Sequence, residues 1–312
     1  VYGNDGTLAG TEFTVAATDA TTGLVLGQSI DSVNLASSAE ADSENVGNYD
    51  ITLDAVTASS GGYLDANYSV TFVEGNYAVT VRPLTINADN QSRIYGNSLN
   101  LDGTEFSVAA ASADTGLALG QTVTTINLSS TATDVNVDAG DYTISADTVT
   151  AGTGGFASSN YDITFVDGTF MVTPRDLVIT AADQSKDYGD AFSFAGTEFT
   201  IAASDANTGL ILGETITSAT LTSGATPSTA DAGEYAITLS DIVGANGFTL
   251  SNYNITNNGG AFLVDPRPIT VTATDQSKIY GNTFTFDGTE FTLLDKDADA
   301  VLPNGEVLDT VN

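Results

Sequence analysis

Three residue types are missing from this chain: none of its 312 residues is histidine, cysteine or tryptophan. Without an imidazole or a thiol, the chain cannot form a histidine-dependent serine triad, a cysteine nucleophile, a cysteine–histidine zinc site or an iron–sulfur cluster. The absence of cysteine also excludes disulfides, so each domain must be held together by a packed core. It leaves the compartment open, because secreted and cytosolic proteins can both lack cysteine.

Basic residues are scarce as well, with 7 Lys and Arg against 40 Asp and Glu, for a formal net charge of −33. Such a polyanion repels phosphate groups, so we expect neither a nucleic-acid partner nor attraction to anionic lipid. No apolar run is long enough for a transmembrane helix, so we expect no membrane insertion within this segment. A solubilising surface is the simplest interpretation of the acidic residues, and Ca²⁺ binding is the alternative.

What the chain does have is internal repetition. The Tyr-Gly pair occurs at 2–3, 95–96, 188–189 and 280–281, and Gly-Thr-Glu-Phe at 10–13, 103–106, 196–199 and 288–291. A period near 90 residues is too long for a solenoid coil and suits one small globular domain. We predict four domains: 1–82, which lacks its first strand, 83–174, 175–267, and a partial copy, 268–312. The incomplete ends indicate a segment of a longer tandem protein.

Within each copy the apolar pattern favours β structure. Residues 161–165 alternate apolar and polar, Asp167-Gly168 follows, and 170–172 alternate again, which predicts a β-hairpin with a two-residue turn. No segment has a sustained helical period. We predict an all-β fold, with each copy a small immunoglobulin-like β-sandwich, or alternatively a β-grasp with one short helix over the glycine-rich connection.

The copies adjoin without a Gly/Ser linker. The predicted joint residues are Arg82, Pro83, Pro174, Arg175, Pro266 and Arg267. Proline fixes φ and removes a backbone donor, so short proline joints predict a stiff rod of domains arranged end to end. Two interpretations of the arginines stay open: they pair with carboxylates of the adjoining domain and set its angle, or they are solvated charges that contribute well under about 1 kcal/mol.

The candidates for chemistry are few. Asp114-Thr115-Gly116 matches an aspartic-protease triplet, but the other copies do not keep the aspartate, so we expect no enzyme activity. Asp295, Asp297 and Asp299 alternate, and Glu306 is twelfth from Asp295, a spacing similar to a calcium-binding loop. This segment has no glycine at the sixth position and contains a proline. A Ca²⁺ site and a solvated acidic loop both remain open.

Several motifs resemble the MBG repeats of the Tyr-Gly-x type, which occur in tandem in large bacterial surface and secreted adhesin-like proteins. The matching elements are Tyr-Gly-Asn or Tyr-Gly-Asp (95–97, 188–190, 280–282), Gly-Leu-x-Leu-Gly (23–27, 116–120, 209–213) and Ala-Gly-Asp/Glu-Tyr (139–142, 232–235). The fourth copy departs from the second motif, with Leu-Pro-Asn-Gly at 302–305. The resemblance implies an extracellular spacer or stalk module with no catalytic residues.

We therefore expect a structural segment of a bacterial extracellular adhesin or surface fibre, which projects a distal domain or builds an extended rod. Its nearest partners are then the neighbouring copies of the same chain. The alternative is that the copies themselves bind a host protein, a glycan or a neighbouring fibre, or that they assemble into filaments, with or without Ca²⁺.

Overall fold

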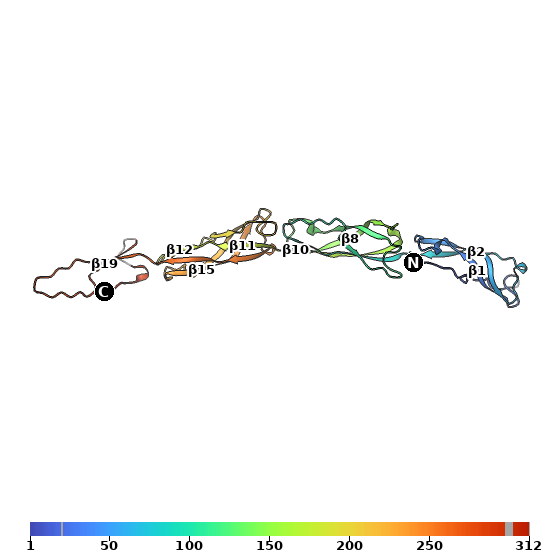
Figure 1. Ribbon diagram of the computed structural model, residues 1–312, viewed down its shortest axis with the longest axis horizontal. Helices are drawn as coiled ribbons and strands as arrows, with labels where there is room; N and C mark the ends of the chain where they lie inside the picture. Colours follow the sequence, from blue (N-terminus) through green and yellow to red (C-terminus); the bar gives the residue numbers. More distant parts are fainter. Residues whose placement is uncertain (20, 297–301, 312) are drawn as a thin grey trace. The chain divides into compact units, whose positions relative to one another are not determined.

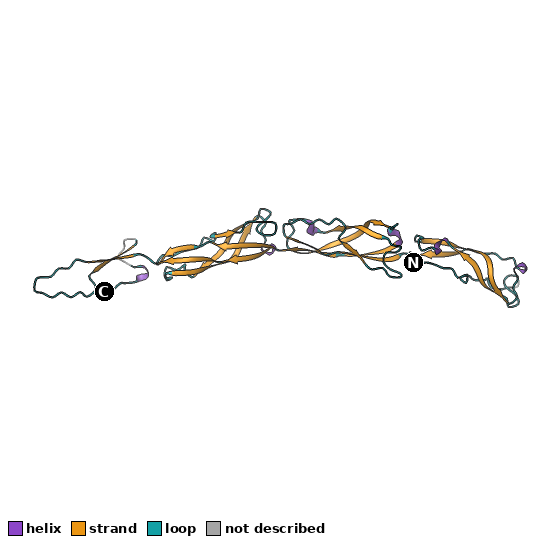
Figure 2. Ribbon diagram, in the orientation of Figure 1, coloured by secondary structure: helices purple, strands orange, loops and turns teal. Residues whose placement is uncertain are grey.

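The structure is a computed structural model, which describes residues 1–19, 21–296 and 302–311 (Figure 1). Among these residues the regular elements are β-strands and three-residue 3-10 turns (Figure 2). The 3-10 turns are η1 (Ser38–Glu40), η2 (Asp65–Asn67), η3 (Thr131–Thr133), η4 (Ser158–Asn160), η5 (Leu250–Asn252) and η6 (Pro303–Gly305). The prediction of tandem all-β copies is confirmed.

The strands recur in the same order in each copy. The first copy contains β1 (Ser29–Ala36), β2 (Gly47–Ser60) and β3 (Gly75–Val79). The second contains β4 (Arg82–Ala88), β5 (Gln91–Ile94), β6 (Phe106–Val108), β7 (Thr122–Ser129), β8 (Gly140–Thr153), β9 (Tyr161–Val166) and β10 (Gly168–Thr173). The third contains β11 (Arg175–Ala181), β12 (Gln184–Asp187), β13 (Phe199–Ile201), β14 (Thr215–Ser223), β15 (Gly233–Ala245), β16 (Tyr253–Asn258) and β17 (Gly260–Asp265). The fourth contains β18 (Ile269–Ala273) and β19 (Phe291–Asp295).

The chain divides into two compact units, and the division passes through the second copy. The first unit comprises Val1–Ser92, Leu99–Thr133 and Asp141–Met171, and the second comprises Arg93–Ser98, Asp134–Gly140 and Val172–Asn312. The Tyr-Gly loop of the second copy therefore belongs to the same unit as the third copy. The residues through which two successive copies contact each other therefore belong to the same unit at each joint.

In the second unit, the third copy is built of two sheets. One has the strand order β13-β11-β16, and the other has the order β12-β17-β15-β14. β15 contacts both β11 and β16 of the other sheet, and fully buried side chains from both sheets form the core: Leu177, Ile179, Ile237, Phe262 and Val264. Because successive residues of a strand point to opposite faces, the alternation in the sequence places one apolar row of each strand in this core.

Two of the strand pairs of the third copy are parallel, which the sequence did not indicate. β11 pairs with β16 so that Arg175 lies opposite Tyr253, and β12 pairs with β17. The first strand of a copy thus starts beside the sixth strand, at the end of the domain that meets the preceding copy. The helix that the β-grasp alternative requires is absent from the described residues, and the two facing sheets agree with the sandwich alternative.

The second copy, most of which belongs to the first unit, repeats this plan with the sheets β6-β4-β9 and β5-β10-β8-β7. The buried side chains of this unit include Leu84, Ile86, Ile126, Ile144 and Phe170. The first copy has a single three-stranded sheet, β1-β2-β3, within the residues that the structure describes.

The predicted hairpin at Asp167-Gly168 is wrong, although both of its strands are present. β9 and β10 belong to different sheets, as do β16 and β17 in the third copy. Neither Gly168 nor Gly260 has a positive φ. A Cβ atom would lie 2.8 Å from the Ala88 carbonyl oxygen at Gly168 and 2.7 Å from the Ala181 carbonyl oxygen at Gly260. Glycine is required here because the chain passes close to another strand as it crosses between sheets.

Candidate functional site

The first joint is centred on Arg82, which is buried at the start of β4. Its Nε donates to the Gly116 carbonyl (2.9 Å) and its Nη2 to the Ser112 carbonyl (2.7 Å), both in the second copy. Its Nη1 donates to the Tyr2 carbonyl (3.2 Å) and to Asn4 Oδ1 (2.9 Å) in the first copy. One guanidinium therefore joins the Tyr-Gly-Asn loop of one copy to the glycine-rich connection of the next.

The second joint repeats this arrangement around Arg175, which is only 2% exposed. Its Nε donates to the Gly209 carbonyl (3.1 Å), and its Nη2 to the Asp205 carbonyl. Its Nη1 donates to the Tyr95 carbonyl (3.4 Å) and to Asn97 Oδ1 (3.2 Å). All of these acceptors are neutral. The expectation that joint arginines pair with carboxylates is thus not met at Arg82 or Arg175, because carbonyls of the two loops occupy the donors.

A buried tyrosine accompanies the arginine at the first joint. Tyr2 lies edge-on to Tyr161, with ring centroids 5.6 Å apart and planes at 78°. Gln121 binds both hydroxyls: its Nε2 donates to Tyr2 Oη (2.8 Å), and its Oε1 accepts from Tyr161 Oη (2.6 Å). The tyrosine of one copy therefore fits into a socket that the next copy provides.

At the second joint the socket contains a carboxylate. Tyr95 lies edge-on to Tyr253, with centroids 5.8 Å apart, and both hydroxyls donate to Glu214, at 2.8 Å from Tyr95. Glu214 is 6% exposed. Burial, followed by the hydrogen bond to Glu214, raises the pKa of Tyr95 to about 12, and the same two causes raise the pKa of Tyr253. Both tyrosines therefore stay protonated and donate.

A buried asparagine adds a further link at each of these joints. Asn160, at the end of η4, accepts from the Val46 amide (3.0 Å). Asn252, at the end of η5, accepts from the Ala139 amide (2.7 Å) and donates to Asp138 Oδ1 (2.8 Å). Each copy thus binds its predecessor at two separate loops, which opposes rotation about a single contact.

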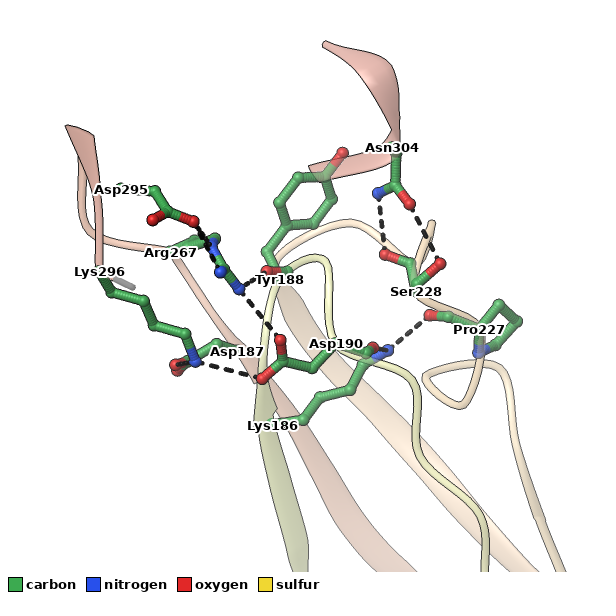
Figure 3. A network of polar contacts seen from close by, with 10 residues as sticks. All are labelled: Lys186, Asp187, Tyr188, Asp190, Pro227, Ser228, Arg267, Asp295, Lys296 and Asn304. Carbon is green, nitrogen blue, oxygen red and sulfur yellow. Dashed lines mark hydrogen bonds and ion pairs between the residues drawn. The ribbon is translucent and has the colours of Figure 1, made fainter. Parts of the chain in front are cut away.

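The third joint has the same position but a different chemistry (Figure 3). Arg267 Nη2 lies 2.7 Å from Asp295 Oδ2, and its Nη1 lies 3.0 Å from Asp190 Oδ1. Nη1 also donates to the Tyr188 carbonyl at 3.5 Å, the contact equivalent to those of the other joints. At this joint the predicted pairing of the arginine with carboxylates is what the structure shows.

Lys296 extends the ionic network of the third joint. Its Nζ pairs with Asp187 and lies 3.2 Å from Asp190 Oδ2. Hydrogen bonding from Lys296 is the leading cause that lowers the pKa of Asp190, and that from Asp187 is the leading cause that raises the pKa of Lys296. Figure 3 shows the Lys296 ammonium and the Arg267 guanidinium each bound to a different oxygen of the Asp190 carboxylate.

The tyrosine of the third joint also has its acceptor. The Tyr188 hydroxyl donates to Glu306, and this hydrogen bond is the leading cause that raises the pKa of Tyr188. Asn304 donates to the Ser228 carbonyl (3.0 Å). Gln121, Glu214 and Glu306 occupy one repeat position, directly after the glycine-rich connection. Sequence reasoning missed this position, although its constant polarity after an apolar motif was the available signal.

The candidate Ca²⁺ ligands are only partly within the described residues. Asp297 and Asp299 lie outside them. Asp295 is bound by Arg267, and Glu306 accepts the Tyr188 hydroxyl, so cationic or hydroxyl donors already surround these two carboxylates. The part of the chain that the structure describes contains no group of three acidic side chains that could hold a metal ion. The Ca²⁺ hypothesis stays a prediction.

The three joint prolines border the arginines and make no comparable contacts between copies. Pro83 lies within β4, opposite Asp162 of β9, Pro174 lies between β10 and β11, and Pro266 lies between β17 and β18. Their backbone constraint agrees with the position predicted for each boundary. The hydrogen bonds that join the copies come from the arginines, the tyrosines, the amides and Lys296.

Comparison with known families gives one match. The sequence profile of the MBG domain (YGX type) matches residues 1–78, 84–171 and 177–263. No curated protein matches the chain. Within the described residues, no helix has the length and apolar character needed to cross a membrane.

Proposed function

We propose that this chain, which belongs to the MBG domain (YGX type) family, is a structural repeat segment that spaces other parts of an extracellular surface protein. Each copy binds the next, and the polar groups at the boundaries serve that contact. The extracellular location and the spacer role form one proposal. The alternative is that the copies bind a host protein or a glycan, and binding measurements on the same chain and its variant test it.

The observation that supports the proposal is the buried arginine at the first joint and at the second joint. Arg82 and Arg175 hydrogen bond to backbone oxygens of both neighbouring copies, and each is almost fully buried. Bending such a joint would separate these groups and leave buried carbonyls without donors, at a cost of about 1 to 3 kcal/mol for each unsatisfied group. A joint of this kind resists bending without the help of a rigid linker.

The tyrosine socket and the asparagine contact support the same conclusion. At the second joint Tyr95 inserts beside Tyr253, and Asn252 holds a different loop of the preceding copy. Two contacts at separate loops define an angle between neighbouring domains, where one contact would act as a pivot. This favours a spacer whose domains keep a fixed orientation.

Small-angle X-ray scattering tests the proposal, with the chain eluting from a size-exclusion column at low concentration. We expect the profile of a stiff particle whose longest dimension grows with the number of copies. A variant that combines Arg175→Ala with Glu214→Ala should become flexible at the second joint alone. A freely jointed profile for the unchanged chain would contradict the spacer role.

The binding alternative makes a separate prediction. A spacer should show no saturable binding to host matrix proteins or to glycan arrays at micromolar concentration. Saturable binding that survives in the Arg175→Ala, Glu214→Ala variant would assign a recognition role to the copies themselves.

A further inference from the structure

The Gly-Thr-Glu-Phe motif contacts a strand through the same hydrogen bond in every copy. In the third copy the Ala219 amide, in the middle of β14, donates to the Gly196 carbonyl (2.9 Å). The equivalent donors and acceptors in the other copies are Val33 and Gly10 (2.9 Å), Ile126 and Gly103 (3.0 Å), and Val311 and Gly288 (2.9 Å). Because the contact recurs in all four copies, it belongs to the common plan of the repeat and not to one joint.

Glycine and glutamate hold the motif in this position. The Glu198 carboxylate accepts hydrogen bonds from the three amides that precede it in its own loop, which belong to Ala195 (2.7 Å), Gly196 (2.9 Å) and Thr197 (3.0 Å). Gly196 has a φ of +87°, and a Cβ atom there would lie 3.1 Å from the Ala219 carbonyl oxygen. Residues with a Cβ atom rarely adopt that φ, so the loop needs glycine to turn its carbonyl toward β14.

The strand that the motif contacts lies at the edge of its sheet. β14 is the last strand in the order β12-β17-β15-β14, and β7 has the same place in the second copy. An edge strand presents backbone donors and acceptors that can pair with another chain, and charged residues or proline commonly prevent this. Thr122–Ser129 and Thr215–Ser223 contain neither, although acidic residues are abundant elsewhere in the chain. These two edges therefore need another form of protection.

The motif covers the edge in place of charge. The Gly196 carbonyl binds Ala219 of β14, while the Glu198 carbonyl accepts from the Ala182 amide (2.9 Å), next to β11 of the other sheet. The loop therefore spans the side of the domain between the two sheets. Ala219 also lies at a register shift in the pairing of β14 with β15, so the loop and the irregularity together interrupt the free side of the strand at its middle.

We propose that the Gly-Thr-Glu-Phe motif is an edge cover, which keeps β14 from pairing with β14 of a second chain, and that the two strands pair once the cover is displaced. The strands then run antiparallel about a two-fold axis, each contributes the same residues, and the contact closes at a dimer. Hydrogen bonds between the two backbones hold the pair together. β7 provides an equivalent edge in the second copy.

Charge favours a second copy of this chain as the partner at this edge. A formal charge of −33 on each chain opposes contact over most of the surface. Thr215–Ser223 has no charged residue, so this strand meets the same strand of another chain without like charges directly opposite one another.

The edge cover and the second joint use different residues. The hydrogen bonds of the cover come from 195–198 and Ala219, and those of the joint centre on Arg175 and Glu214. Lateral pairing of chains can therefore fail as a prediction while the end-to-end contact of copies stands, and the reverse also holds.

Light scattering coupled to size-exclusion chromatography tests the proposal on the full chain over a wide range of concentration. Glu198→Ala removes the acceptor of three amides, so we expect its mass to rise to twice that of the unchanged chain, which stays monomeric. Glu234→Ala is the matched control, because it removes one exposed negative charge from β15 of the same sheet, and it should stay monomeric. Glu105→Ala combined with Glu198→Ala displaces two covers and should give assemblies larger than a dimer.

A second set of variants separates the strand from the charge. Gly196→Val displaces the cover without a change of charge, because valine is strained at a φ of +87°, and it should dimerise as Glu198→Ala does. Thr220→Glu, added to Glu198→Ala, restores the net charge and places like charges on the two paired edges, so the dimer should dissociate. Ala236→Glu adds the same charge to the interior strand β15 and should leave the dimer in place.

Hydrogen exchange followed by mass spectrometry distinguishes displacement of the cover from unfolding. In dilute solution, Glu198→Ala and Gly196→Val should both lose protection in 215–223 and keep it in 260–265, which belongs to the same sheet. A chain that stays monomeric in both variants, or a dimer that persists when Thr220→Glu is added, would overturn the proposal.

Discussion

The second and third joints occupy the same repeat position within one compact unit, yet different forces hold them. Arg175 donates to neutral carbonyls and to the amide of Asn97. Arg267 binds the carboxylates of Asp190 and Asp295. Both joints place an arginine against a Tyr-Gly loop, and they differ in the groups that accept hydrogen bonds from that arginine. The same backbone arrangement can therefore form either a neutral or an ionic joint.

Two substitutions between the copies account for the difference. The residue after Tyr-Gly is Asn97 in one loop and Asp190 in the next, and the position of Asp295 is Ala203 in the third copy. The neutral joint relies on geometry, because a guanidinium that loses its carbonyls finds no replacement inside the interface. The ionic joint relies on charge, so pH and salt should act on it and leave the neutral joint unchanged.

The largest expected effect comes from Arg175→Ala. It leaves several buried carbonyl oxygens of both copies without donors, and we expect a loss of about 3 to 5 kcal/mol in the free energy that holds this joint closed. Hydrogen exchange followed by mass spectrometry measures the loss at residues 205–214. Arg175→Lys should restore little of this free energy, because the three donors of an ammonium sit on one nitrogen and cannot reach the acceptors of both loops. Unchanged hydrogen exchange in Arg175→Ala would show that this arginine does not hold the joint closed.

Arg267→Ala should cost about 3 kcal/mol near neutral pH, because it removes the guanidinium that lies 2.7 Å from the Asp295 carboxylate, whose side chain is only 3% exposed. The contrast with Arg175 lies in the pH dependence. Hydrogen bonds from Lys296 and, to a smaller extent, from Arg267 lower the pKa of Asp190, so the part of the loss that involves Asp190 should shrink in acid as this carboxylate is protonated. No carboxylate accepts a hydrogen bond from Arg175 at the second joint, so the loss of Arg175 should not depend on pH in this way. Exchange of residues 291–296 between neutral and acidic pH measures the difference. If the loss of stability in Arg267→Ala does not change with pH, the third joint does not differ from the second in its dependence on charge.

Glu214→Ala removes the shared acceptor of Tyr95 and Tyr253, and we expect a loss of about 2 kcal/mol as two buried hydroxyls lose their partner. Glu214→Gln should cost under about 1 kcal/mol, since the first joint has Gln121 at this position. Burial and the hydrogen bond to Glu214 raise the pKa of Tyr95 to about 12, so the stability that this tyrosine contributes is present below the ordinary pKa of tyrosine and is lost as pH rises through about 12. Glu214→Gln removes the carboxylate, so ultraviolet titration should show that tyrosine ionises at a lower pH in this variant. An unchanged titration would mean that burial alone sets this pKa.

The sequence predicted the features that depend on local pattern, such as the positions of strands. It did not predict which strands pair or which distant side chains contact each other. Alternation at 161–165 placed β9 correctly, and the repeated arginines marked each joint. Alternation specifies which face of a strand is buried but not which strand lies beside it, so the parallel pair of Arg175 and Tyr253 stayed hidden and a hairpin was predicted instead. Tyr95 and Glu214 lie 119 positions apart, and only folding brings them together.

The smallest effect is expected from Lys296→Ala, which removes the exposed part of the ionic network. Lys296 is the leading cause that lowers the pKa of Asp190, so its contribution is present above the ordinary pKa of an aspartate and is lost as pH falls through the lowered value. The variant should therefore open the third joint slightly at neutral pH and match the unchanged chain in strong acid. Raising salt from about 0.1 M to about 1 M should have the same effect as the substitution, because both remove interactions between partly exposed charges. Exchange at 187–190 measures each condition, with 95–97 of the neutral joint as the internal reference. If both segments respond to salt alike, the distinction between an ionic and a neutral joint does not hold.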